Sequence, residues 1–229
     1  MNYKIIIGDD DQLFSALLKS VLEQEGHSVS VCDSPKAFRR AVRETGPDAV
    51  FLDVMFGSED GRELCRKLRG DAATRKIAVI MVTAVRREIE DISEGLDQGA
   101  DDYLLKPLDR RLVLSKLSSV MRRFRAPEEL APALDSYGLK LDPLGRRVGV
   151  RGREIPLTRL EFDLLTYFLR RPGTVVTGRQ MLEEVFGYDP DKYGNPATLH
   201  VHIARLRQKL GKAFAVRLAT LVNAGYRLD

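Results

Sequence analysis

The sequence contains little cysteine and no long apolar segment, and these absences exclude several classes of protein. Its two cysteines, Cys32 and Cys65, form no CxxC pair and are too few for a disulfide framework. The longest uninterrupted apolar run, 77–82, is far shorter than the ~20 residues of a membrane-spanning helix. The chain does not open with the charged and then apolar segments of a secretory signal peptide. We therefore expect a soluble, cytoplasmic protein without a membrane partner.

Charge is unevenly distributed along the chain. Residues 1–123 hold 20 basic and 21 acidic side chains, residues 124–135 hold 1 and 3, and residues 136–229 hold 16 and 9. The net charge of +4 therefore originates in the C-terminal part, whose own net charge is +7. This asymmetry is typical of a chain in which one part binds a polyanion, and a solvated basic surface is the alternative.

The first 123 residues alternate between two hydrophobic periods. Short apolar runs rich in branched residues occupy 3–7, 29–32, 49–52, 77–82 and 103–105. Between these runs, apolar residues recur at the spacing of helices. Strands this uniformly apolar are buried on both faces, and their alternation with helices indicates parallel pairing. The pattern predicts an α/β doubly wound (βα)5 domain whose site lies beyond the carboxyl ends of the strands.

The remaining residues follow a different pattern. Periodicity stops over 124–135, where two prolines and several acidic residues cluster, and we interpret this segment as a linker. Short strands are predicted at 139–141, 148–150 and 155–157. Three helices follow, of which the third begins at Pro196, and the tail over 216–228 is predicted to form a hairpin. These elements describe an α+β winged helix-turn-helix domain over 136–229.

Carboxylates and two other polar groups follow the predicted strands of the first domain. Asp9 and Asp10 come after the first strand, Asp53 ends the third, Thr83 ends the fourth, and Lys106 follows the fifth. Parallel strands end at one edge, so the three carboxylates would repel one another and raise each other's pKa. A hard divalent cation such as Mg²⁺ relieves that repulsion. This set of groups can hold a phosphoryl group during in-line transfer.

At these positions residues 1–123 resemble the receiver domain of bacterial two-component response regulators. The matching stretches are IIIGDDD at 5–11, LDVM at 52–55 with Gly61, MVTA at 81–84 and GADDYLLKP at 99–107. The resemblance implies that a partner histidine kinase phosphorylates Asp53. It further implies that Mg²⁺, or Mn²⁺ in its place, is bound by Asp10, Asp53 and the carbonyl of Met55, with Asp9 acting through a water. Lys106 and Thr83 would contact the phosphoryl oxygens, and Tyr103 would be the rotating switch aromatic.

Three positions depart from the receiver pattern. Gly57 replaces the proline that usually follows the acceptor by four residues, which loosens the loop without removing a ligand. Met55 and Val85 occupy the positions that tune self-hydrolysis in the family, and neither side chain can orient an attacking water. We therefore predict a long-lived phosphoryl state in a protein that is not an enzyme beyond slow loss of that group.

In related regulators the fourth helix, fifth strand and fifth helix form a two-fold dimer face after phosphorylation. Charged residues stand in the corresponding segments here: Asp97, Asp101, Asp102, Arg111, Lys116 and Arg122. Ile92 and Leu112 occupy two positions that usually carry a basic and an acidic partner. Apolar replacement of both members of an ion pair can be neutral or stabilising. Our hypothesis is that Ile92 and Leu112 meet across a homodimer, and ordinary helix packing is the alternative.

The third helix of the C-terminal domain has the features of a DNA-reading helix. Its core stripe is Leu199, Ile203, Leu206 and Leu210, and beside or opposite that stripe lie Thr198, Val201, His202, Arg205, Arg207, Gln208 and Lys209. Arginine reads guanine and glutamine reads adenine bidentately in the major groove of double-stranded DNA. The sequence therefore predicts a DNA reader, and an ordinary solvated helix is the alternative.

Residues 136–229 resemble the OmpR/PhoB winged-helix domain. The matching stretches include LTRLEF at 157–162, GYD at 187–189, VHIARLRQKLG at 201–211 and GYR at 225–227. The resemblance implies that Arg205 contacts bases, that His202, Arg207, Thr220 and Tyr226 contact the DNA backbone, and that the loop 187–195 approaches RNA polymerase. Ala197, Ala204 and Val222 stand where the family is often basic, which predicts fewer phosphate contacts and a greater reliance on dimerisation.

Together these features predict a transcription factor controlled by phosphorylation that binds tandem promoter half-sites as a dimer. One alternative is a DNA-binding regulator that works without phosphorylation. A second is a phosphatase with a carboxylate nucleophile. Such phosphatases usually need a second aspartate two residues after the nucleophile, where this chain has Met55.

Overall fold

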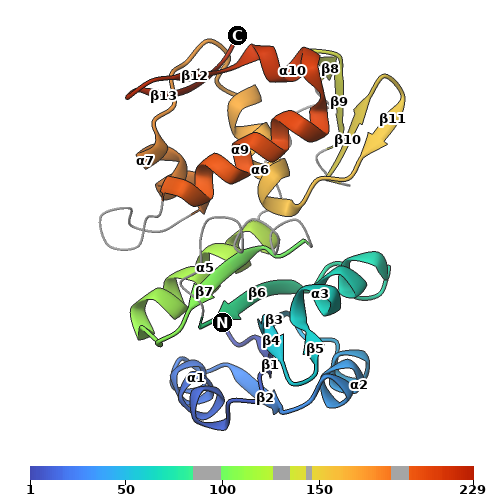
Figure 1. Cartoon of the computed structure of the whole chain (residues 1–229), viewed down its shortest axis with the longest axis vertical. Coiled ribbons are helices and arrows are strands. Elements are labelled where there is room, and N and C mark those ends of the chain that lie inside the picture. Colours follow the sequence, from blue (N-terminus) through green and yellow to red (C-terminus); the bar gives the residue numbers. More distant parts are fainter. Residues whose placement is uncertain (85–98, 126–134, 143–145, 187–195) are drawn as a thin grey trace. The chain divides into compact units, whose positions relative to one another are not determined.

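The computed structural model describes residues 1–84, 99–125, 135–142, 146–186 and 196–229, and the chain forms two compact units, 1–124 and 125–229 (Figure 1). Because the units are not placed relative to each other, we describe each by itself. Ile92, Asp97 and Val85, as well as the loop 187–195, lie outside the described residues.

The first unit contains the predicted parallel sheet. Its strands are β1 (Lys4–Gly8), β2 (Ser28–Cys32), β3 (Ala49–Asp53), β6 (Ala78–Thr83) and β7 (Asp102–Leu105), in the order β2-β1-β3-β6-β7. Every pair in this sheet is parallel. The described helices between and after them are α1 (Gln12–Gln24), α2 (Pro35–Thr45), α3 (Gly61–Gly70) and α5 (Arg110–Arg125). The doubly wound fold is confirmed.

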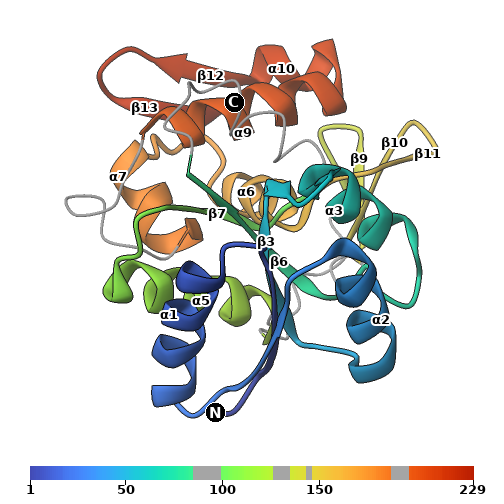
Figure 2. The same ribbon diagram turned by 60° about the horizontal axis from the view of Figure 1, so that its bottom comes forward.

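The two faces of this sheet form two separate cores. Ile5 and Ile7 of β1 belong to a cluster with residues of α1 and α5, whereas Ile6 belongs to a cluster with α2 and α3. This division follows from the two-residue period of a strand. Figure 2 shows α1 and α5 on one side of the strands and α2 and α3 on the other. Burial on both sides explains why the strands are almost continuously apolar.

A small hairpin that the sequence did not reveal follows β3. It consists of β4 (Met55–Phe56) and β5 (Glu59–Asp60), with Phe56 opposite Glu59. Gly57 begins the two-residue turn with a φ of 59°, which glycine adopts without strain. A proline could not take this conformation, because its ring fixes φ near −65°. The proline that the family usually has at this position would therefore not fit the turn.

The boundary between the units falls close to the predicted one. Helix α5 continues to Arg125, two residues into the predicted linker, and the units divide after Phe124. The first strand of the second unit, β8 (Asp135–Ser136), includes the last predicted linker residue.

The second unit has the predicted α+β composition. An antiparallel sheet in the order β11-β10-β9-β8 contains β9 (Leu139–Asp142), β10 (Arg147–Val150) and β11 (Arg153–Ile155). The following helices are α6 (Arg159–Leu169), α7 (Gly178–Met181) with a π-helical turn (Leu182–Phe186), α9 (Pro196–Leu210) and α10 (Lys212–Arg217). The hairpin of β12 (Leu218–Leu221) and β13 (Gly225–Leu228) completes the unit.

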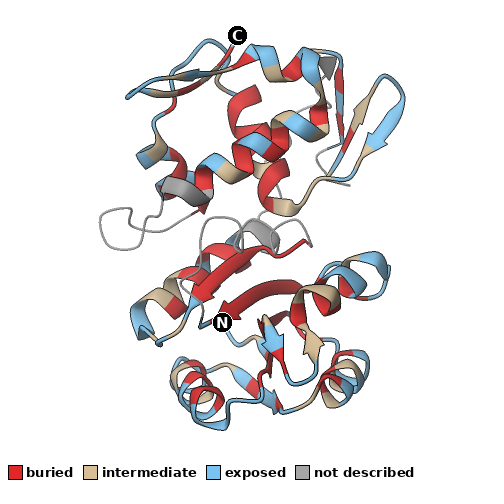
Figure 3. Cartoon of the chain, viewed as in Figure 1, coloured by how far each residue is buried: buried red, intermediate tan, exposed pale blue. Residues whose placement is uncertain are grey.

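Two details of this unit correct the sequence prediction. The tail from 216 was predicted as strand, but residues 212–217 form α10, which buries Phe214 before β12 begins. The strand predicted at 155–157 instead ends at Ile155. Capping boxes begin two of the helices, at Thr158 before α6 and at Thr177 before α7. Figure 3 shows that α6 is buried along most of its length, so the other helices pack around it.

The helix that follows the hairpin packs against the end of β3 through a glycine. A Cβ atom on Gly61 would lie 1.8 Å from the carbonyl oxygen of Asp53, so any side chain there must displace the backbone of Asp53. At Gly70, the last residue of the same helix, a Cβ atom would meet nothing within 4 Å.

We expect Gly61→Ala to lower the free energy of unfolding by about 1–3 kcal/mol, the usual effect of overpacking. The matched control Gly70→Ala should leave stability unchanged or raise it by up to ~1 kcal/mol, because alanine favours the helix. Urea unfolding of both variants measures the difference. Equal stability of the two variants would contradict the close approach of Gly61 to Asp53.

Candidate phosphoacceptor site and candidate DNA interface

Three carboxylates lie together at the carboxyl edge of the parallel sheet. The side chains of Asp9, Asp10 and Asp53 each offer an oxygen, and these oxygens lie within 4.8 Å of one another. Asp9 and Asp53 are buried, with exposed fractions of 2% and 8%, whereas Asp10 is exposed. The strand order places β1 beside β3, which is why residues 44 positions apart in the sequence converge here.

One ammonium group joins two of these carboxylates. The Nζ atom of Lys106 lies 2.8 Å from Oδ2 of Asp9 and 2.9 Å from Oδ2 of Asp53. The same Nζ lies 4.4 Å from the centre of the Phe14 ring, a favourable position for a cation. Lys106 follows β7 directly and precedes a cis peptide bond to Pro107. The structure thus brings together Asp9, Asp53 and Lys106 as the strand-end argument predicts.

Burial and charge act in opposite directions in this cluster. Burial raises the pKa of Asp9 to about 6, against the hydrogen bonds from Lys106 and from the backbone N–H of Asp11, which lower it. Burial alone would lower the pKa of Lys106, but its hydrogen bonds to Asp9 and Asp53 outweigh that effect and raise it. Lys106 therefore stays charged, and burial makes Asp9 costly to ionise without a further cation.

The other predicted receiver residues lie around this cluster. The backbone N–H of Met55 donates to Oδ1 of Asp53 over 3.1 Å, while its side chain is 67% exposed. Thr83, at the end of β6, and Tyr103, on β7, are both buried. Tyr103 belongs to the core cluster on the α2 and α3 side of the sheet.

The donor set fits a hard divalent cation. Three carboxylates offer only oxygen ligands, and one of them is exposed, which leaves room for bound water, as Mg²⁺ prefers. The buried carboxylate of Asp9 would gain a second compensating charge from such an ion. The residues present are therefore consistent with a divalent metal site.

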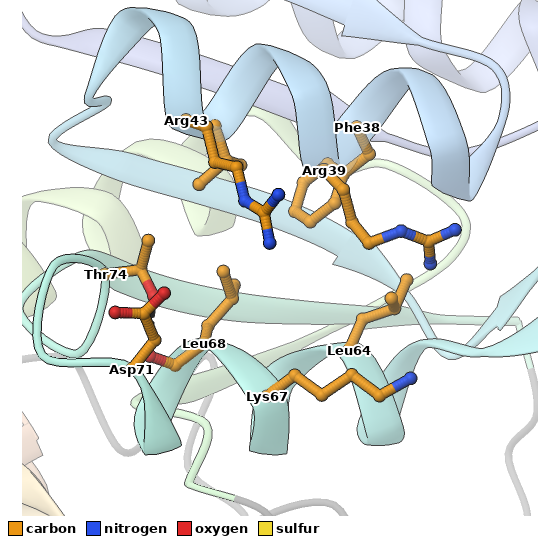
Figure 4. A pocket seen from close by; sticks show the side chains of 9 residues that line it. Phe38, Arg39, Arg43, Leu64, Lys67, Leu68, Asp71 and Thr74 are labelled. Carbon is orange, nitrogen blue, oxygen red and sulfur yellow. Dashed lines mark hydrogen bonds between the residues drawn. The ribbon is translucent and has the colours of Figure 1, made fainter.

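A separate concavity lies between α2 and α3 and takes no part in this cluster. Its volume is about 210 Å³, with an apolar floor and the cations Arg39, Arg43 and Lys67 around it (Figure 4). Arg39 is bound to Glu59 of the β4–β5 hairpin, with Nη1 of Arg39 2.7 Å from Oε2 of Glu59. None of the acidic residues of the strand-end cluster lines this space.

Three residues predicted on the dimer face are buried within the domain. Asp101 is 2% exposed, and its Oδ2 accepts from Arg69 of α3 over 2.6 Å and from the backbone N–H of Val79 over 2.8 Å, so it joins the sheet to α3. Asp102 and Lys116 form a buried pair, 2.7 Å apart. These positions disagree with ion pairing of the three residues at the surface.

For three further residues of the predicted dimer face, the positions do not test whether they contact a second copy. Arg111 and Arg122 of α5 are exposed. Leu112 is half-buried and packs against the core on the α1 and α5 side. Ile92, its proposed partner, lies outside the described residues.

Helix α9 buries the predicted apolar stripe of Leu199, Ile203, Leu206 and Leu210. Among its described side chains from 199 to 210, the exposed ones are His200, Ala204 and Gln208, spaced four residues apart on one face. Val201 is half-buried beside them, and of Thr198 only the helical backbone is described. Gln208 therefore stands where the sequence predicted it, whereas His200 was not among the predicted contacts.

Several predicted DNA contacts make internal interactions instead. His202 is 1% exposed, and its ring centre lies 5.6 Å from that of Phe186. Arg205 is 6% exposed. These residues flank the apolar stripe, where the sequence could not distinguish buried from exposed. The predictions that His202 contacts the DNA backbone and that Arg205 contacts bases disagree with these positions.

Lys209 is used inside the domain as well. Its Nζ lies 2.7 Å from Oε2 of Glu161, a carboxylate in α6 that is 1% exposed. The same oxygen accepts from the backbone N–H of Thr158 in the capping box over 2.7 Å. This pair of a half-buried lysine and a buried carboxylate joins α9 to the start of α6, and the contact of Lys209 with DNA stays a prediction.

Three residues that were predicted to contact the DNA backbone join the wing hairpin to α9. Arg207 donates to the carbonyl oxygen of Leu218 over 3.0 Å and to Oγ1 of Thr220 over 2.8 Å. Its guanidinium carbon lies 5.8 Å from the ring centre of Tyr226. Tyr226 is 3% exposed, while Thr220 is exposed on β12.

Comparison with known proteins gives the same two-part division. Residues 5–118 match the response regulator receiver domain family, and residues 152–228 match the family of C-terminal domains of transcriptional regulatory proteins. The chain is 37% identical over 231 residues to response regulator MprA of Mycobacterium sp. (strain KMS), covering 100% of this chain and 98% of that protein. It is 33% identical over 225 residues to the phosphate regulon transcriptional regulatory protein PhoB of Pseudomonas aeruginosa, covering 98% and 96%.

A solved structure agrees over the full length. Response regulator DrrB of Thermotoga maritima, an OmpR/PhoB homolog, has a TM-score of 0.53 and 26% identity, covering 100% of this chain and 99% of that one. The chain belongs to the OmpR/PhoB-type response regulators. It is a DNA-binding transcriptional response regulator of a two-component system. In the described part of this regulator, no helix is both long and apolar enough to cross a bilayer.

The regulator's Mg²⁺ affinity should depend on pH through Asp9. Because the pKa of Asp9 is raised to about 6, protons compete with the cation for this carboxylate below that pH. We expect the affinity to be constant above pH 7 and to fall about tenfold by pH 5. Calorimetric titration with Mg²⁺ from pH 5 to 8 measures it. The matched control Asp48→Asn, an exposed aspartate, should keep this dependence, and an affinity that stays constant down to pH 5 would exclude Asp9 as its origin.

Lys209→Ala should lower stability rather than DNA affinity, because it leaves the buried carboxylate of Glu161 without its cation. We expect a loss of about 1–3 kcal/mol in the free energy of unfolding. Lys212→Ala, an exposed lysine in α10, is the control and should change little. Thermal melts and DNA titrations against salt measure both effects. A salt slope reduced by about one with unchanged stability would show that Lys209 contacts phosphate after all.

Proposed function

We propose that a histidine kinase phosphorylates this regulator on Asp53 and that the modification controls its binding to promoter DNA. The proposal is supported above all by the placement of Asp53 within 2.9 Å of the Lys106 ammonium and beside two further carboxylates. An oxygen of Asp53 attacks the phosphorus while the bond from phosphorus to the kinase histidine breaks. Lys106 would balance part of the charge of the transferred group, and a divalent cation held by the acidic cluster would supply further neutralisation.

The residues around Asp53 would have separate roles in binding the cation and in orienting the Asp53 carboxylate. Asp10, Asp53 and the carbonyl of Met55 would hold Mg²⁺, or Mn²⁺ in its place, with Asp9 acting through a water. The cation supplies charge neutralisation, and the Met55 N–H orients the second oxygen of Asp53. Met55 stands where a carboxylate-nucleophile phosphatase usually has its second aspartate, so the regulator accepts the phosphoryl group and loses it slowly rather than turning over phosphoesters.

Phosphorylation would act at a distance through β6, the strand beside Asp53, and through β7, the next strand of the sheet. Thr83 would move to bond a phosphoryl oxygen, and buried Tyr103 would change position with it. The regulator would then pair with a second copy through the face that contains Ile92, Leu112, Arg111 and Arg122. Two winged-helix domains bind tandem half-sites in cytoplasmic promoter DNA, and the loop 187–195 approaches RNA polymerase.

Treatment of the full chain with acetyl phosphate and Mg²⁺ tests the proposal. We expect the intact mass to rise by one phosphoryl group, light scattering to show a dimer, and affinity for recovered promoter fragments to increase. Asp53→Asn is the matched control, because its amide oxygen can still accept from Met55, and it should show none of these changes. An unchanged mass in a folded protein, or equal DNA binding by both forms, would leave only a regulator that works without phosphorylation.

A further inference from the structure

The outward face of helix α9 presents a histidine that the receiver and winged-helix motifs do not explain. Among the described side chains from 199 to 210, His200, Ala204 and Gln208 are the exposed ones. They follow one another at intervals of four residues, so they lie along one line that spans about 12 Å of helix. Ala204, between the other two, carries no long side chain, so this face can approach a surface closely.

The ring of His200 is held by the wing hairpin. Its Nδ1 atom is hydrogen-bonded to the hydroxyl of Tyr226, and the two ring centres lie 6.1 Å apart. Tyr226 is itself fixed, because it is 3% exposed and exchanges backbone hydrogen bonds of 2.9 and 2.8 Å with Val176. The Arg207 guanidinium lies near the face of the same tyrosine ring. An exposed histidine would normally move between rotamers, but this one is oriented by a buried partner.

The contact with Tyr226 bears on which ring nitrogen of His200 carries a proton. Burial raises the pKa of Tyr226, although Arg207 opposes this, so the phenol keeps its proton and has it available to donate. When the phenol donates to Nδ1, the proton of the neutral imidazole is on Nε2. This is the tautomer that the inference uses, and in it Nε2 offers an N–H on the side of the ring away from Tyr226.

We propose that His200 is a specificity-determining residue whose Nε2–H donates to guanine in the major groove, with Tyr226 as its positioning residue. Guanine presents two acceptors there, N7 and O6, whereas adenine places an amino donor beside N7. Thymine offers O4 alone beside its methyl group, so a fixed N–H donor is best matched by the paired acceptors of guanine. Phosphate oxygens could also accept a hydrogen bond from this N–H. A phosphate contact would support binding to every sequence equally, whereas a guanine contact would support a preference at one base.

Selection from a randomised DNA library tests the assignment with the full-length, phosphodonor-treated protein. We expect the unaltered chain to prefer guanine at one position in each half-site. His200→Ala should lose that preference by about three- to tenfold, the value of one hydrogen bond, and keep every other preference. Tyr226→Phe keeps the ring but frees the imidazole, so it should weaken the same position. Tyr167→Phe, which removes a hydroxyl elsewhere in the domain, should select the same sequences as the unaltered chain.

A modified base gives a second measurement on the same contact. Replacing guanine by 7-deazaguanine at the selected position should weaken the unaltered protein and have no further effect on His200→Ala. Equal loss of affinity for all sequences in His200→Ala would assign the contact to phosphate and overturn the inference. Unchanged preferences in that variant would overturn it as well. Failure of every folded form, including the unaltered chain, to select any sequence would instead contradict DNA binding itself.

Discussion

Repulsion between carboxylates at one sheet edge is the constraint on which the receiver domain depends. The oxygens of Asp9, Asp10 and Asp53 lie within 4.8 Å of one another, and two of these residues are almost fully buried. The Lys106 ammonium compensates for Asp9 and Asp53 at once, since it lies within 3 Å of both. One cation cannot balance three carboxylates, so the cluster favours a further positive charge. A phosphoryl group added to Asp53 disturbs this balance directly.

The same constraint connects the edge of the sheet to its interior. Lys106 follows β7, and three residues earlier on that strand Tyr103 is packed in the core on the α2 and α3 side. Asp53 also contacts an element that follows it in the chain, because its carbonyl oxygen lies against Gly61 at the start of α3. Under the proposed function, a change in charge at Asp53 would therefore act on two packed elements, β7 and α3. Close-packed cores respond to such changes by shifting between arrangements rather than by deforming gradually.

The sequence could predict the residues that a local pattern and the order of the strands together place at one edge of the sheet. Polar residues that end apolar strands must meet at one edge of a parallel sheet, and Asp9, Asp53 and Lys106 do. The flanks of α9 were not predictable in the same way. Lys209 is placed by a buried carboxylate 48 residues away, and His202 by the Phe186 ring. No spacing within the helix reveals such partners, because the side of a helix next to its apolar stripe can face either protein or solvent.

The internal use of these cations affects how the DNA-binding domain can work. The C-terminal part carries a net charge of +7, but Arg207 is bound to the wing hairpin and Lys209 to Glu161. The exposed described residues of α9 are a histidine, an alanine and a glutamine. Fewer helix cations are therefore available for phosphates, which supply most sequence-independent affinity. Joining two domains raises their effective concentration on adjacent half-sites without any new contact. Weak binding by one domain would make the proposed pairing of the receivers an effective control.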